Sequence, residues 1–130
     1  MSFDIFVMRF ENGETVPLDM AVAHEVLGPF VVGRDSGADV LSVRTAEGEE
    51  ADVYLNPPDG ITFNRFGGGG IMDLLAELLR RLDAVLVVPG GTVVVQGDEA
   101  RRQLPGVLAD AGPTVIARTG AEIDRAIRAA

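Results

Sequence analysis

The stretch from residue 40 to residue 66 constrains the fold most, because it carries three short apolar runs separated by turn signals. The runs are VLSVRTA (40–46), ADVYLN (51–56) and ITFNRF (61–66), and the turns between them read EGEE and PPDG. Apolar and polar residues alternate along each run, as in strands, and connections this short join antiparallel neighbours. We therefore expect an antiparallel meander with one face packed and the other partly exposed to water.

Segments before and after this meander add a central strand and two helices. Residues 3–10 (FDIFVMRF) are apolar on both alternating faces, which predicts a strand in the middle of the sheet. Apolar residues recur at helical spacing in 19–30, where Asp19 can cap the first turn. The clearest helix is predicted at 71–82 (IMDLLAELLRRL).

The C-terminal third continues the alternation of strands and helices. Apolar runs predict strands at 84–88, 92–96 and 114–117, with a hairpin turn at PGG (89–91). A short helix opens at 97–99 and is broken by Pro105, and a last helix follows Thr119, which has capping-box spacing to Glu122. The whole pattern predicts a single α+β domain over residues 1–130, a mainly antiparallel sheet with helices packed mostly on one side.

Composition narrows the classes of partner. Hydrophobic residues make up 47% of the chain and charged residues 24%, which suits a globular core. The formal net charge is −9, and all 11 basic residues are Arg. Because nucleic-acid binding depends on neutralising phosphates, we expect no nucleic-acid partner, whereas a basic protein partner suits the charge.

The opening stretch, MSFDIFVMRFENGE, has no basic segment followed by an apolar core, as a secretory signal would have. No run reaches the roughly 18–20 uninterrupted apolar residues that span a bilayer. We therefore expect a cytoplasmic protein that makes no contact with membranes.

Four glycines stand between the predicted strand at 61–66 and the predicted helix at 71–82. One interpretation is an anion site at the start of the helix, formed by Arg65, Gly67, Gly68, Gly69 and Gly70. The other is a structural joint between strand and helix.

Three features of the sequence favour the joint. GGGGIMD fits neither the phosphate-loop nor the dinucleotide fingerprint, and the chain has no Lys. If Gly70 is the N-cap, Asp73 is the third helical residue and its carboxylate occupies the positive end of the helix. Strand alternation also sends Asn64 and Arg65 to opposite faces.

Candidate catalytic and metal-binding residues are scarce. The chain has no Cys, and its one His, His24, lacks the second His that an H-E-x-x-H zinc helix needs. None of the serines at positions 2, 36 and 42 lies in a G-x-S-x-G context. We therefore expect no catalytic residue, no metal site and no cofactor.

Three segments carry a resemblance: the opening MSFDIFVMRFENGE, the strand ITFNRF that leads into glycines and a Leu-rich helix, and GDEARRQLP. Together they resemble small uncharacterised bacterial proteins that begin MS-(Y/F)-D with a hydrophobic strand. The resemblance spans most of the chain and implies no activity or site residue. In size, acidity and α+β type, the chain is also similar to immunity proteins of bacterial toxin systems.

These observations predict a non-catalytic protein-interaction domain, of immunity or accessory type, with a basic partner. The alternative is a small-molecule or anion-binding domain that uses the glycine-rich loop. Several apolar runs with few polar strand faces also make a homodimer an expected arrangement.

Overall fold

The computed structural model describes residues 4–35, 39–56, 60–64, 66 and 68–130. Its strands are β1 (Ile5–Glu11), β2 (Glu14–Val16), β3 (Val31–Asp35), β4 (Val40–Arg44), β5 (Glu50–Asn56), β6 (Gly60–Asn64), β7 (Val85–Val87), β8 (Val93–Val95) and β9 (Thr114–Ile116). Its helices are α1 (Met20–Leu27), α2 (Gly70–Leu82), α3 (Asp98–Arg102), α4 (Gly106–Ala111) and α5 (Gly120–Ala129), and a 3₁₀ turn spans Gly28–Phe30.

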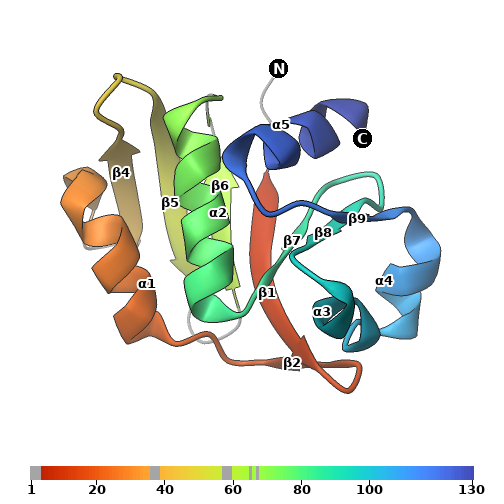
Figure 1. Cartoon of the computed structure of the whole chain (residues 1–130). Coiled ribbons are helices and arrows are strands. Elements are labelled where there is room, and N and C mark those ends of the chain that lie inside the picture. The colour runs from red at the N-terminus through yellow and green to blue at the C-terminus, as the bar shows by residue number, and fades with distance from the viewer. Residues whose placement is uncertain (1–3, 36–38, 57–59, 65, 67) are drawn as a thin grey trace.

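The described strands form one nine-stranded sheet in the order β3-β4-β5-β6-β1-β7-β8-β9, with β2 paired to β1 alone (Figure 1). Neighbouring strands are antiparallel except β8 and β9. The predicted α+β class and the predicted β4–β5–β6 meander are confirmed, and β1 lies in the middle of the sheet as its two apolar faces indicate. Most of the predicted PPDG turn (57–60) falls outside the described residues.

The strands β2 and β3 were not predicted. β3 follows directly on the 3₁₀ turn, contains Gly33, and has a register shift against β4 between Val31 and Gly33. Strand β3 lies at the edge of the sheet, and its Val32 is 55% exposed to solvent. A short, irregular edge strand has little alternation, so the pattern of the sequence does not reveal it.

Three helices, α1, α2 and α5, cover one face of the sheet (Figure 1). The helix α2 is amphipathic, as predicted, and its buried side chains join those of β1, β5 and β6 in the main core. Side-chain hydrogen bonds cap the first turns of the two flanking helices, α1 and α5, at the residues that the sequence predicted. Asp19 accepts from the N–H groups of Ala21 and Val22 in α1, and Thr119 and Glu122 form a capping box in α5.

The two short helices, α3 and α4, belong to the other face. Val94 of β8 lies in the main core, whereas Val93 and Val95, which point the opposite way, form a second cluster with Phe10 and Leu104. The second cluster covers only the β7–β8 end of that face. None of the helices within the described residues combines the length and apolar composition needed to cross a bilayer.

Candidate functional site

The glycine run leads into the N-terminus of α2. Gly69 is the N-cap, with a φ of +56° and a ψ of −119°, a conformation that essentially only glycine adopts. Helix α2 begins at Gly70. Of the five candidate anion-site residues, the structure therefore brings Gly68, Gly69 and Gly70 to the start of the helix. Arg65 and Gly67 lie outside the described residues.

A carboxylate of the protein itself occupies this helix N-terminus. The N–H of Gly70 donates to Glu49 Oε1 at 2.7 Å, and Thr45 Oγ1 donates to the same oxygen at 2.9 Å. Both Thr45 and Glu49 come from the connection between β4 and β5. Negative charge at the start of a helix is favourable, so Glu49 supplies what a bound anion would otherwise supply.

The sequence pattern predicted that the carboxylate at this helix N-terminus would be that of Asp73, and this prediction is corrected by the structure. Since the N-cap is Gly69 rather than Gly70, Asp73 lies one position further into the helix than expected. Its side chain contacts the start of α5 instead: a Cβ added to Gly120 would clash with Asp73 Oδ1. Glu49 was missed because 21 residues separate it from Gly70, too far for any local capping pattern.

Close packing explains why the first residue of α2 has no side chain. A Cβ at Gly70 would lie 2.8 Å from Thr45 Cβ, from Thr45 Oγ1 and from Glu49 Oε1. Thr45 is only 8% exposed, which leaves it little room to move. The glycine at this position therefore lets the β4–β5 connection reach the backbone of the helix.

Next to this joint lies a cavity of about 350 Å³ between α1, α2 and the β4–β5 connection. Its apolar lining comes from Val26 of α1, Phe30 of the 3₁₀ turn and Leu74 of α2. Gly70 is also part of the wall, so the glycine run does border a hollow in the surface. The volume is at the lower end of the range for small-molecule sites.

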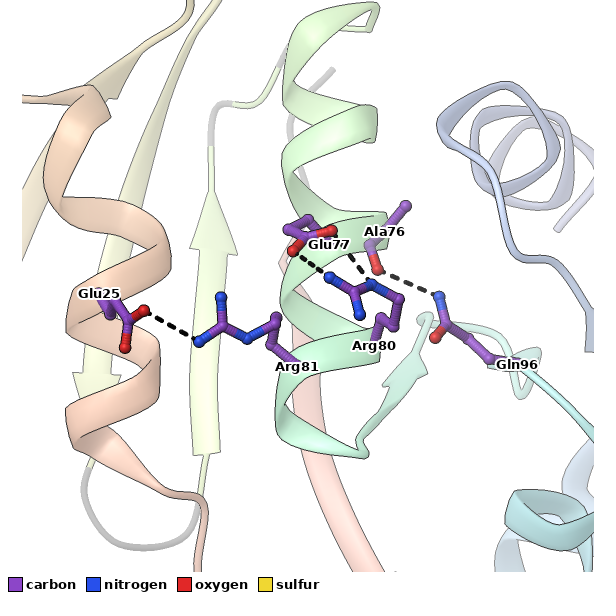
Figure 2. Close-up of polar contacts among 6 residues, drawn as sticks. All are labelled: Glu25, Ala76, Glu77, Arg80, Arg81 and Gln96. Carbon is purple, nitrogen blue, oxygen red and sulfur yellow. Dashed lines mark hydrogen bonds and ion pairs between the residues drawn. The ribbon is translucent and has the colours of Figure 1, made fainter.

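The polar lining of this cavity is mainly acidic. Glu47, Asp73 and Glu77 contribute carboxylates, against the single guanidinium of Arg81. Figure 2 shows Arg81 reaching from α2 to Glu25 on α1, with 3.1 Å between Arg81 Nη2 and Glu25 Oε1. The positive charge in the lining is therefore already paired with a carboxylate.

Glu77 has a neighbour of its own on α2. Arg80 Nη2 donates to Glu77 Oε1 at 2.5 Å, and this hydrogen bond raises the pKa of the Arg80 side chain above its ordinary value (Figure 2). On the other flank of the helix, Gln96 Nε2 donates to the carbonyl oxygen of Ala76 at 3.1 Å (Figure 2). These contacts lie on both sides of the buried stripe of α2, and the Glu77 carboxylate is already paired with Arg80.

A second candidate is the part of the sheet face that α3 and α4 leave open. Phe6 of β1 pairs in register with Thr62 of β6, which pairs with Tyr54 of β5, so the three share one row on the same face. Phe6 is 36% exposed and Tyr54 39%. The row continues to Val40, opposite Tyr54, and to Val87, opposite Phe6.

The next row of the same face is polar and acidic. Asp52 pairs in register with Asn64, and the Asn64 side chain hydrogen-bonds to the carboxylate of Asp4. We call the two rows together the open sheet face; its members are Val40, Tyr54, Thr62, Phe6, Val87, Asp52, Asn64 and Asp4. Alternation within each strand predicted that one face would be partly wet, but which aromatic residues become neighbours depends on strand register, which the sequence does not give.

The single histidine is exposed on α1, off the buried stripe as expected. It lines a different cavity, of about 330 Å³, together with Asp35 and Asp39. Within the part of the chain that the structure describes, no group of three or more His, Asp or Glu side chains is placed to hold a metal ion.

Comparison with known proteins gives no further guidance. No protein-family model, no curated protein and no solved structure matches the chain. The resemblance to small bacterial proteins that begin MS-(Y/F)-D thus stays a prediction, and the geometry of the molecule carries the functional argument.

Proposed function

We propose that the protein is a non-catalytic protein-interaction domain whose open sheet face binds a basic partner. The observation that carries this proposal is the exposure of Phe6 and Tyr54 in one cross-strand row. Exposed apolar patches bordered by polar residues are typical of interaction surfaces, and aromatic side chains supply much of the binding free energy there.

The charge of the open sheet face indicates the chemistry of the partner. Asp4 and Asp52 border the aromatic row, and the chain as a whole has a net charge of −9. A partner with an apolar strip beside Lys or Arg side chains would complement both rows, and its association would be accelerated by long-range attraction. Neutralising a basic toxin, or a similar accessory role, is the setting in which we place this interaction.

A second copy of the chain is the competing occupant. In a symmetric dimer through this face, each copy would bring its own Asp4 and Asp52 to the same interface. Like charges placed together oppose association, so the acidic row favours a basic partner over a homodimer. Sedimentation across micromolar concentrations distinguishes the two, because a dimer through this face would dissociate on dilution.

The experiment compares the wild-type chain with the double variant Phe6→Thr/Tyr54→Thr. Threonine keeps the β-propensity of the strands while it removes the aromatic rings. The matched control is Val107→Thr, which removes an apolar side chain that is 80% exposed on α4. Each protein is used to capture partners from its own host at increasing salt, and the recovered partner is then purified and titrated.

We expect a basic partner whose Kd rises with salt, about tenfold weaker binding by the double variant, and no change with Val107→Thr. If the double variant binds as tightly as wild type, the open sheet face is not the interface. If no partner is recovered at any ionic strength, the proposal of a protein-interaction domain fails.

Small-molecule binding is the second candidate function, and the cavity beside Gly70 favours it. The anion-binding form of this function has less support, because the Glu49 carboxylate already accepts from the Gly70 N–H. A thermal-shift screen with small acids, neutral molecules and amines tests it, since a ligand that binds only the folded chain raises Tm. A Tm that no class of ligand changes would remove this candidate.

A further inference from the structure

The cavity between α1 and α2 has a definite arrangement of apolar and charged groups. Val26, Phe30 and Leu74 supply apolar surface; Val26 and Leu74 are nearly fully buried, which fixes their positions. The α2 part of the lining runs from Gly70 to Arg81. At 1.5 Å per residue this is roughly 16 Å, long enough for an elongated ligand about the size of an aromatic amino acid.

The charged groups around this apolar surface disfavour the binding of anions. Gly70 forms part of the cavity wall, and its N–H already donates to the carboxylate of Glu49. Arg81, the one cation in the lining, is paired with Glu25. An entering anion would therefore meet the carboxylates of the lining without a free helix N-terminus or an unpaired guanidinium in compensation.

The same charges complement a cation. Glu47 comes from the β4–β5 connection and Asp73 from α2, so two separate segments contribute carboxylates to one apolar hollow, whereas the third carboxylate of the lining, Glu77, already accepts from Arg80. Phe30 adds an aromatic ring, whose face attracts organic cations.

We propose that this cavity binds a small organic cation with an apolar body, of the class of primary amines on an aromatic or aliphatic stem. The apolar body lies against Val26, Phe30 and Leu74, and the ammonium group lies toward Glu47 and Asp73. This inference rests on the second candidate function and deepens it. It is independent of the open sheet face, which uses none of these residues.

Three probes of similar shape and different charge test the inference on the full chain. They are 3-phenylpropylamine, 3-phenyl-1-propanol and 3-phenylpropanoate, which at neutral pH carry a positive, a zero and a negative charge. Each is titrated up to millimolar concentration while the amide resonances of the labelled protein are followed. We expect the amine to shift the resonances of Ala46, Gly70 and Leu74, the alcohol to bind about three- to tenfold more weakly, and the propanoate to bind least.

Two variants locate the binding and its charge dependence. Glu47→Gln/Asp73→Asn should weaken binding of the amine about threefold or more and leave binding of the alcohol unchanged, because only the charge is removed. The matched control, Glu14→Gln/Asp110→Asn, removes two exposed carboxylates on β2 and α4 and should change neither Kd. Ala46→Trp, at an exposed position of the lining, should block all probes that enter the cavity.

The inference is overturned if the alcohol or the propanoate binds at these residues as tightly as the amine. In that case the cavity is an apolar site without selection for cations, and small-molecule binding itself stands. It is also overturned if none of the probes shifts these resonances at millimolar concentration. Neither result bears on the Phe6→Thr/Tyr54→Thr experiment, which should leave amine binding unchanged.

Discussion

The N–H of Gly70 donates a 2.7 Å hydrogen bond to Glu49 Oε1, and this contact joins the start of α2 to the β4–β5 connection. The same oxygen accepts from Thr45 Oγ1, so one carboxylate is bonded both within the β4–β5 connection and to the start of α2. Gly70 therefore belongs to a packed joint between sheet and helix. The joint forms one wall of the cavity and closes the helix N-terminus to outside anions.

Replacing Gly70 by Ala should destabilise the fold by about 1–3 kcal/mol, because its Cβ would lie 2.8 Å from Thr45 and Glu49 atoms. The matched control is Gly68→Ala. A Cβ there has its nearest neighbour at 3.8 Å, and the φ of Gly68 is not in the left-handed region. The control should change the free energy of unfolding by no more than about 0.5 kcal/mol. Equal effects of the two changes, measured by urea denaturation, would show that close packing is not what requires Gly70.

Glu49→Ala should lower the free energy of unfolding by about 1 kcal/mol, since it removes the acceptor for the Gly70 N–H and the negative charge at the helix start. Glu49→Gln keeps an acceptor oxygen and should have roughly half that effect. The loss caused by Glu49→Gln should shrink as salt is raised, because only the charge is removed. Glu47→Gln, in the same connection but exposed, is the control and should be close to neutral. A Glu49→Gln effect that salt does not change would contradict the electrostatic account.

Much of the fold could be predicted because it is encoded locally. The alternation in β4, β5 and β6, the apolar stripe of α2 and the Thr119–Glu122 capping box each lie within a few consecutive residues. Periodicity and capping chemistry act over that range, so the pattern of the sequence and the final structure agree there.

The candidate sites depend on contacts between distant residues, and the sequence could not predict them. Glu49 reaches Gly70 across 21 positions, and Phe6 and Tyr54 become neighbours only through their common partner Thr62. Both depend on strand order and register, which apolar periodicity leaves open. The glycine run did mark the right place, but what requires a glycine at position 70 is the approach of Thr45 and Glu49 rather than of an anion.

Glu122 should make the stability of the protein depend on pH. The N–H groups of Arg118 and Thr119 donate to Glu122 Oε1 at 3.1 and 3.2 Å, and these bonds lower the pKa of the carboxyl below 4.5. Because the pKa is lower in the folded chain than in the unfolded chain, the stabilisation is fully present above pH 4.5 and is lost as the pH falls through the folded pKa. Glu122→Gln should therefore be less stable than wild type at pH 7, and the difference should close in acid. Denaturation curves recorded from neutral pH to pH 3 test this, and a difference that stays constant with pH would contradict it.

Gly120→Ala should be among the most damaging single changes in the chain, because α5 begins directly against α2. An added Cβ would clash with Asp73 Oδ1 and would lie 2.7 Å from the Asp73 backbone nitrogen and 2.9 Å from the Met72 carbonyl carbon. The Asp73 side chain can rotate away, but the backbone atoms of a packed helix cannot, so we expect a loss of about 2–3 kcal/mol. Gly106→Ala is the control, since it also lies at the first position of a helix and a Cβ there meets nothing within 4 Å. That change should be neutral or stabilising by up to about 1 kcal/mol, because Ala restricts the unfolded chain. If thermal and urea denaturation give the same free-energy change for both substitutions, the close approach of α5 to α2 is not what requires a glycine at position 120.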